Sequence, residues 1–303
     1  MDEPLVSVGI PCYNRPEGLR RTLECITGQT YTNLEIIVSD NCSPNPEVER
    51  VGREFAEKDP RVKYVRQSDN LGALPNFHYV LRTANGKYFM WGSDDDEWSP
   101  NFIEATYSCL EKNPDSNMAF TNIVSVDTFG NTIRNYPGWL RFTKEKKFKL
   151  LIRFVFEPEI LGKANLMYSL FERNFCINVW NCFFDDRDFT WGADNGFVLC
   201  ALMQTHFSSV EDILLLKRLL RSDDSVDIVR PLKIIPFFGV FPFLESLDYT
   251  CTIVRACKQT PYWPLVFICM IFRIPHSLMV SMAKTILCTL KIYNPIEADN
   301  AGK

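Results

Sequence analysis

Four short apolar segments, each followed by a segment of helical character, occupy the first third of this 303-residue chain. Between the apolar segments the larger apolar residues recur at helical spacing, as Leu19, Leu23 and Ile26 do. Strands that alternate with helices predict a largely parallel sheet with helices on both faces, which is an α/β fold. The predicted strands are Leu5–Pro11, Leu34–Val38, Val62–Val65 and Tyr88–Trp91.

Polar segments follow three of these strands. The first strand leads into Pro11–Arg15, the second into Ser39–Ser43 and the fourth into Gly92–Trp98. Parallel strands in such a fold end at one edge of the sheet, and ligands bind beyond that edge, so we expect the functional residues there. Neither GxGxxG nor GxxxxGK[ST] follows any of the strands, which argues against a dinucleotide-binding domain and a P-loop ATPase.

The three consecutive acids Asp94–Asp96 allow two interpretations. They suit a solvated turn or the cap of the helix that Ser99 and Pro100 open, because aspartate favours both places. They also suit a Mg²⁺ or Mn²⁺ site, for which one or two protein carboxylates suffice when a diphosphate supplies further oxygens. Because three polar strand ends converge on one edge, we favour the cation site.

The first 114 residues contain, in this order, VSVGIPCYNRPEGLRRTLECITGQTYTNLEIIVSDNCSPN, DNLGALPNF and NGKYFMWGSDDDEWSPNFIE. In order and spacing these segments resemble the nucleotide-sugar half of the inverting family 2 glycosyltransferases with the GT-A fold. The resemblance implies that Pro11, Tyr13 and Arg15 wrap the nucleotide of a nucleoside-diphosphate sugar. It also implies that Asp40 contacts the nucleobase.

For the acid cluster, the resemblance implies that Asp94 contacts the sugar diphosphate and that Asp95 binds the Mg²⁺ or Mn²⁺ directly, with Asp96 as a further metal ligand. Three positions depart from the common family pattern: Ser39, Ser93 and Ala193 stand where acids are frequent. The QxxRW sequence that marks processive members does not occur, so transfer of a single sugar is favoured over polymer synthesis.

An inverting transfer needs one carboxylate that accepts the proton of the acceptor hydroxyl. The resemblance places this base at the start of a helix in the second half, where Asp194 stands within Trp191–Asn195. A plain helix cap is the alternative role of Asp194. Glu211 and Asp212 are the rival pair, although they lie late and inside an apolar stretch of strand character. We interpret three further acids as a solvated turn: Asp185, Asp186 and Asp188.

The distribution of charge divides the chain. Residues 1–248 carry 27 basic and 35 acidic groups, whereas the remainder carries 6 basic and 2 acidic groups and is strongly apolar. A pair of helices packed on the core is one interpretation of this tail. We favour the other, a segment that lies on an anionic membrane surface, because apolar and basic residues coincide there without acids.

Overall composition narrows the class of protein. With 46% hydrophobic residues the chain can build a core, and its net charge of −4 argues against a nucleic-acid partner. Eleven scattered cysteines without a CxxC pair favour reduced thiols. The start of the chain lacks the features of a signal peptide. We therefore expect a cytoplasmic protein. The basic, apolar tail suggests an alternative, in which the protein is peripherally bound to the inner face of the plasma membrane.

The resemblance implies a metal-dependent, non-processive glycosyltransferase, and the composition and charge agree with it. We expect a GT-A domain at 1–230, in which 1–115 bind the donor and 116–230 bind a glycan or lipid-linked glycan acceptor. We expect a helical, membrane-associating extension at 231–303. The alternatives are a sugar-nucleotide nucleotidyltransferase and a non-catalytic glycan-binding protein on the same fold. The first of these would carry a Gly-rich loop with a basic residue after the first strand, which PCYNRPEG is not.

Overall fold

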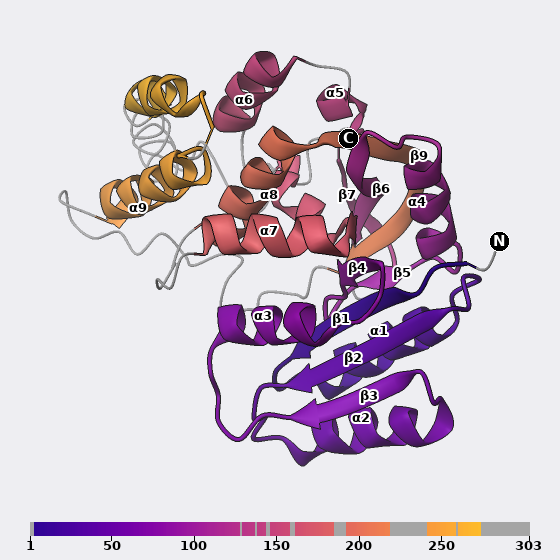
Figure 1. The fold of residues 1–303 in the computed structure, drawn as a ribbon. Coiled ribbons are helices and arrows are strands. Elements are labelled where there is room, and N and C mark those ends of the chain that lie inside the picture. The colour runs from indigo at the N-terminus through magenta and orange to yellow at the C-terminus, as the bar shows by residue number, and fades with distance from the viewer. Residues whose placement is uncertain are drawn as a thin grey trace.

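The structure is a computed structural model that describes residues 3–273, apart from 128, 137, 144–145, 158–160, 185–191, 219–240 and 259. Of residues 241–248 it describes the backbone alone. The chain forms one mixed sheet with helices on both faces (Figure 1). Some predictions concern residues outside this description: the turn with Asp185, Asp186 and Asp188, and the domain boundary between 230 and 231.

The first half has the predicted parallel architecture. Its strands are β1 (Val6–Cys12), β2 (Leu34–Asp40), β3 (Val62–Arg66) and β4 (Tyr88–Trp91), in the order β3-β2-β1-β4. Its helices are α1 (Pro16–Thr27), α2 (Pro46–Lys58) and α3 (Ala73–Thr83). Right-handed crossovers place α1 and α2 on one face and α3 on the other, because the chain reverses direction across the sheet after β3 (Figure 1). All residues of β1 and β2 are therefore buried.

The second half extends the same sheet with a different pattern. Its strands are β6 (Ser116–Val126), β7 (Thr132–Asn135), β8 (Leu170–Glu172) and β9 (His206–Arg218), and the short strand β5 (Glu97–Trp98) from the end of the first half joins them. The three-residue strand β8 joins the halves, because it pairs antiparallel with both β4 and β6. Strand β9 runs parallel to β6 and antiparallel to β5. The sheet is thus parallel in its first half, as predicted, and mixed as a whole.

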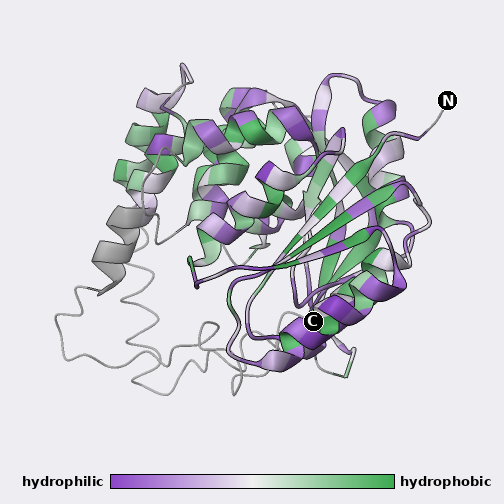
Figure 2. Cartoon of the chain, turned by 60° about the horizontal axis from the view of Figure 1, so that its bottom comes forward, coloured by the Kyte–Doolittle hydropathy of each residue, from purple (hydrophilic) through white to green (hydrophobic). Residues whose placement is uncertain are grey.

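The helices of the second half cover this extension and continue beyond it. They are α5 (Leu140–Thr143), α6 (Lys147–Phe156), the 3-10 helix η2 (Lys163–Tyr168), α7 (Arg173–Phe183), α8 (Ala193–Gln204) and α9 (Phe241–Ala256), followed by a helix at 263–273. Helix α4 (Phe102–Glu111) precedes them at the end of the first half. The strands are largely hydrophobic, whereas the outer helices alternate between hydrophilic and hydrophobic residues (Figure 2). Within the described residues, no helix is both long enough and apolar enough to span a bilayer.

An aromatic cluster joins the two halves. Trp91, the last residue of β4, is fully buried and makes edge contacts with Phe171 of β8 and Phe197 of α8, with ring centres 6.1 and 5.4 Å apart. Trp180 of α7 packs on the same tryptophan and stacks on His78. The predicted division at 115/116 falls between α4 and β6, and both sides of it contribute to this one core.

A buried carboxylate ties the amino-terminal ends of the first strands together. Glu35 of β2 is 5% exposed and accepts four hydrogen bonds. The donors are the Ser7 hydroxyl at 2.6 Å, the Lys63 ammonium at 2.7 Å, and the backbone and side-chain N–H groups of Asn85, both at 2.8 Å. Burial alone would raise the pKa of Glu35, but the hydrogen bonds outweigh it and lower the pKa to about 2.

We therefore expect Glu35→Gln to lower the free energy of unfolding by about 2 kcal/mol, since it removes a charged hydrogen-bond acceptor from a buried site. The contribution of Glu35 should be fully present above pH 4.5 and be lost as the pH falls toward 2, because the folded state holds its proton less tightly than the unfolded state. Urea unfolding at pH 7 and pH 3.5 measures both effects. Glu57→Gln, at an exposed position of α2, is the matched control. Equal losses for the two variants would contradict the assignment.

Candidate functional site

The acid loop, which we define as Gly92–Asp96, follows β4 and rests on the first turns of α1. Gly18 lies so close to it that a Cβ atom at this position would be 2.1 Å from the Asp94 carbonyl oxygen. Thr22, one turn further along α1, donates its hydroxyl to the Ser93 carbonyl at 2.8 Å. Because α1 begins directly after β1, with Pro16 at its first position, the ends of β1 and β4 form one packed unit.

Two carboxylates of the acid loop converge on one guanidinium nitrogen. Arg15 Nη1 lies 3.2 Å from Asp94 Oδ1 and 2.7 Å from Asp95 Oδ2. The backbone N–H of Tyr13 donates to Asp94 Oδ2 at 3.2 Å, and the Ser93 hydroxyl donates to Asp95. Four of the residues predicted to bind the donor or the metal thus lie in one cluster, although their roles stay predictions.

The cluster has a surplus of negative charge. Burial and the neighbouring charge of Asp95 raise the pKa of Asp94 to about 7, even though Arg15 and the N–H of Tyr13 oppose the shift. Burial lowers the pKa of Arg15, but the two acids outweigh burial and raise it. One guanidinium therefore does not fully compensate two adjacent carboxylates in this place, and a second cation would be electrostatically favourable.

Asp96, the last residue of the acid loop, contacts the end of β9 and not Arg15. Its carboxylate is almost wholly buried, lies 3.5 Å from the Lys217 ammonium and accepts the backbone N–H of Arg218 at 3.3 Å. Burial raises the pKa of Asp96 to about 6, and Lys217 opposes this shift. Asp96 thus ties the acid loop to the end of β9, and its predicted role as a metal ligand stays a prediction.

Two further residues that contact the acid loop, Lys217 and Tyr168, are not predicted by the sequence analysis. Burial lowers the pKa of Lys217, but Asp96 and Tyr168 outweigh burial and raise it. The Lys217 ammonium lies 5.6 Å from the ring centre of Tyr168, whose pKa is raised by burial and which hydrogen-bonds Ser93. A single lysine after Leu214–Leu216 in an apolar strand was the available signal, because a charge there requires a buried partner.

Asp40 lies at the same edge of the sheet, one strand away. It is fully buried at the end of β2, in register with Cys12 of β1. Its Oδ2 accepts hydrogen bonds from the Tyr64 hydroxyl at 2.8 Å and from Arg66 at 3.0 Å. Its Oδ1 accepts the backbone N–H of Ser43 at 2.8 Å. The acid is therefore rigidly held, and its predicted contact with the nucleobase stays untested.

The loops after β1 and β2 are bound to each other and to the start of α3. The Asn14 N–H donates to the Ser43 hydroxyl at 2.9 Å, and Asn41 exchanges hydrogen bonds with the 70–72 turn. Gly72 has a φ of +84°, which explains why a glycine stands at this turn. Pro11 is buried in β1, in register with Ser39 of β2, and so positions the loop that follows it.

Ser39, which stands where the family pattern often has an acid, is held by two side chains. Its hydroxyl donates to Asn76 Oδ1 at 2.6 Å and accepts a hydrogen bond from Gln67 at 2.9 Å. Asn76 also donates to the Ser39 carbonyl at 3.0 Å, so the first turns of α3 are fixed to the end of β2. A serine thus serves here as a hydrogen-bonding link within the fold.

Asp194 lies in the first turn of α8, whose cap is Gly192 in the left-handed conformation. Asp194 is exposed, and its Oδ1 accepts the backbone N–H of Asn195 at 2.7 Å. One turn further, Phe197 packs on Trp91, the residue that directly precedes the acid loop. Glu211 and Asp212 are exposed within β9, where the pairing with β6 shifts register. Their assignment to a strand is confirmed.

The donor atoms at the acid loop fit a hard divalent cation. Two carboxylates already meet at one cationic group, and Mg²⁺ and Mn²⁺ prefer carboxylate oxygens together with phosphate oxygens. Across the described part of the chain, no three acidic, histidine or cysteine side chains form a ready-made metal site. A metal held here would therefore need oxygens from a ligand such as a diphosphate.

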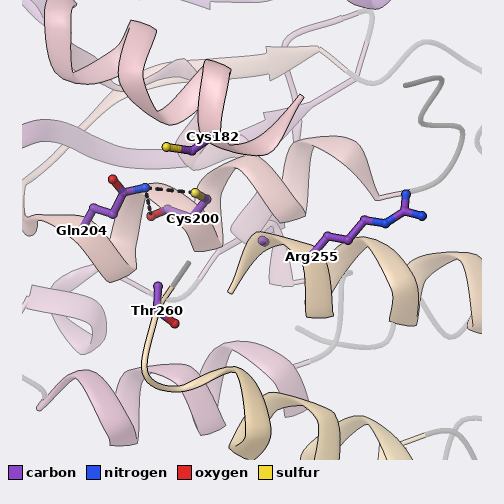
Figure 3. Close-up of a pocket in the computed structure, with 6 residues that line it drawn as sticks. Cys182, Cys200, Gln204, Arg255 and Thr260 are labelled. Atoms are coloured by element: carbon purple, nitrogen blue, oxygen red, sulfur yellow. Dashed lines mark hydrogen bonds between the residues drawn. The ribbon is translucent and has the colours of Figure 1, made fainter. Parts of the chain in front are cut away.

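A small cavity away from the acid loop is not a candidate donor site. It has a volume of about 90 Å³ and lies where α7, α8 and α9 meet (Figure 3). Cys182, Cys200, Gln204 and Arg255 line it, and Gln204 Nε2 donates to the Cys200 carbonyl at 3.3 Å. None of the predicted donor or metal residues lines it, and it is too small for a nucleotide sugar.

Comparison with known sequences identifies relatives of one kind. The family described as Glycosyl transferase family 2 matches residues 7–168. An uncharacterized glycosyltransferase of Methanocaldococcus jannaschii, MJ1057, is 26% identical over 271 residues, which cover 88% of this chain and 89% of that protein. An uncharacterized glycosyltransferase of Rickettsia felis is 33% identical over 134 residues, which cover 43% of this chain and only 21% of that protein.

Solved structures share the fold. S. aureus TarS 1-349 in complex with UDP-GlcNAc aligns with a TM-score of 0.62 at 14% identity, covering 86% of this chain and 70% of that one. The mannosyltransferase PcManGT from Pyrobaculum calidifontis, in complex with GDP-Man and Mn²⁺, aligns with a TM-score of 0.52 at 15% identity, covering 98% of this chain and 83% of that one.

The close contact between α1 and the acid loop predicts the effect of Gly18→Ala. Alanine normally stabilises a helix relative to glycine by about 0.5–1 kcal/mol, but here its Cβ would collide with the Asp94 backbone. We expect a net loss of about 1–3 kcal/mol in the free energy of unfolding, as for overpacked cores. Urea unfolding measures it. Glu24→Ala at an exposed position of the same helix should change stability by less than about 0.5 kcal/mol. A Gly18→Ala protein that is more stable than the unchanged protein would contradict this prediction, because the acid loop would then have moved away without cost.

Proposed function

The chain belongs to glycosyltransferase family 2 and is a glycosyltransferase, and from this premise we propose that it transfers one sugar, with inversion, from a nucleoside-diphosphate sugar to a glycan or a lipid-linked glycan. The observation that carries the proposal is the convergence of Asp94 and Asp95 on Arg15 at the edge where β1, β2 and β4 end. An edge of this kind is where an α/β sheet binds its ligand.

The donor would lie across the three strand ends. Arg15, Asp94 and Asp95 would meet the diphosphate and its counter-ion, and Tyr13, which is 43% exposed, would offer a ring beside them. The structural relatives support a nucleotide-sugar donor, because TarS carries UDP-GlcNAc and PcManGT carries GDP-Man. The two relatives differ in both the sugar and the nucleobase of the donor, so the support extends to the class of donor alone.

Asp94 and Asp95 would hold a Mg²⁺ or Mn²⁺ ion, with Asp95 as the direct ligand. Such an ion supplies charge that stabilises the leaving diphosphate. Support comes from the surplus negative charge of the cluster and from the Mn²⁺ in PcManGT. Asp96, whose carboxylate faces Lys217, would act here mainly by holding the loop on β9.

Asp194 would act as the general base. It would take the proton of the acceptor hydroxyl while the hydroxyl oxygen forms a bond to the anomeric carbon of the sugar. The bond from that carbon to the diphosphate oxygen breaks on the opposite side, and the nucleoside diphosphate leaves with the bonding electrons. The contact between Phe197 and Trp91 supports the assignment, since it places the first turns of α8 beside β4.

A panel of labelled nucleoside-diphosphate sugars, assayed with and without EDTA, tests this function. We expect hydrolysis or transfer of at least one donor, loss of the activity in EDTA and its recovery with Mg²⁺ or Mn²⁺. Activity that survives EDTA would contradict the role of the metal. The absence of turnover across the panel, with intact folding, would favour the non-catalytic alternative.

Asp95→Asn should weaken metal-dependent donor binding about tenfold or more, because even residues that only support a metal ligand contribute about 10–100-fold. Titration calorimetry with the preferred donor, with and without Mn²⁺, measures this loss. Asp115→Asn, at an exposed position before β6, is the matched control and should bind normally. Unchanged Mn²⁺-dependent donor binding in the Asp95 variant would contradict the proposal that Asp95 is a ligand of the metal.

Asp194→Asn should leave the dissociation constant of the donor unchanged and lower kcat about 10²–10⁴-fold, the usual contribution of a general base. Steady-state transfer assays and donor titration together separate the two effects. Asp212→Asn carries the same chemical change to the rival acid in β9 and should retain activity. If the Asp212 variant were the inactive one, the base would have to be reassigned.

A further inference from the structure

The helix at 263–273 has one face in the protein and one face open to solvent. Val266 and Met270 are almost fully buried, and Cys269 is 7% exposed, so this side of the helix is fixed on the core. The other side bears large apolar residues, each about half exposed or more. We define this apolar helix face as Trp263, Phe267, Ile268, Ile271 and Phe272.

The apolar helix face differs from the other exposed apolar residues of the described chain. Those others are scattered over the chain, for example Leu71 before α3 and Ile213 on β9, and only α6 bears two of them, Phe148 and Phe156 at its opposite ends. Here five large side chains lie within ten residues, and Phe272 is 68% exposed. A contiguous apolar patch of this kind marks an interaction surface, whereas single exposed apolar residues are normal.

Hydrogen bonds and a side-chain contact hold the helix that carries the apolar helix face against α9. Val266 donates its N–H to the Tyr262 carbonyl at 3.1 Å, and the Thr260 hydroxyl donates to the Cys257 carbonyl at 2.8 Å, so the turn between α9 and the helix is closed by hydrogen bonds. The Arg273 guanidinium lies 4.2 Å from the ring centre of Tyr249 in α9. The two helices lie together at the left edge of the molecule in Figure 1. A partner would therefore meet a surface that is already formed, so docking would cost little ordering entropy.

The charge around the patch indicates the partner. No acidic residue occurs between Asp248 and Glu297, whereas Arg255, the exposed Lys258 and Arg273 flank the helix. Residues 1–248 are net acidic, with 27 basic and 35 acidic groups, and would be repelled by a negative surface. Basic residues beside exposed aromatic and aliphatic residues suit the interface of an anionic lipid bilayer.

We propose that the apolar helix face docks on an anionic bilayer surface, with Trp263, Phe267 and Ile271 entering the headgroup region and Lys258 contacting lipid phosphates. This docking is independent of the donor chemistry proposed above, so either proposal can fail without the other. It gives the predicted membrane association a defined surface within the described residues. The rest of the predicted extension, 274–303, lies outside them.

Vesicle flotation of the full chain tests the proposal. The probes are phosphatidylcholine vesicles with and without one quarter phosphatidylglycerol, at low and at high salt. We expect flotation with the anionic vesicles, little with the neutral ones, and a decrease as salt screens the charges. Sedimentation away from both kinds of vesicle would overturn the proposal.

The double variant Phe267→Ser/Ile271→Ser should reduce the bound fraction about tenfold or more, because it removes half-exposed apolar area. Ile213→Ser, a residue equally exposed on β9, should float like the unchanged protein. Lys258→Ala should weaken binding to anionic vesicles about fivefold and Lys258→Arg should restore it. Thermal melting confirms that each variant is folded. Equal flotation of the double variant and the unchanged protein would overturn the proposal.

Sedimentation velocity without lipid separates a second copy of the chain from a bilayer as the occupant. We expect the full chain and the double variant to sediment alike at all concentrations. A concentration-dependent dimer that the Phe267→Ser/Ile271→Ser change dissociates would overturn the proposal in favour of self-association through the same face.

Discussion

Two neighbouring carboxylates share one guanidinium nitrogen at the end of β4, and most of the surrounding structure serves to hold them there. Asp94 is 8% exposed, so it cannot rely on water to carry its charge, and Asp95 stands beside it. Arg15 from the loop after β1 supplies one positive charge, and Gly18 and Thr22 of α1 fix the loop backbone. On the far side Lys217 neutralises Asp96. An acidic loop of this kind folds stably because both its faces carry cations, yet it still favours a further one.

The first half of the fold and of the site could be predicted because its interactions are local or periodic. Strands such as Tyr88–Trp91 are short apolar runs between helical repeats, and parallel strands bring their carboxyl ends to one edge whatever the loop details. The meeting of Tyr13, Arg15, Asp94 and Asp95 follows from that topology.

What could not be predicted depends on contacts between distant segments. Strand β8 has three residues and no periodic signal, yet it joins β4 to β6 and makes the sheet mixed. The same holds for Lys217, which lies 121 positions after Asp96 and has no local pattern that points to the acid loop. Asp40 was foreseen at the correct edge, but its internal bonds to Tyr64 and Arg66 required the register of β2 with β3.

The position of α8 links the two halves of the proposed reaction. Phe197 packs against Trp91, so the helix that carries Asp194 and the strand that carries the acid loop share one side-chain contact. Trp91 is fully buried and touches Phe89, Phe171 and Trp180 as well, which means that a shift of α8 would disturb the whole aromatic cluster. Close-packed protein interiors transmit strain from one side chain to its neighbours. The geometry between the proposed base on α8 and the proposed donor site at β4 would therefore be set by the core, whereas loop residues would determine which sugar and which acceptor fit.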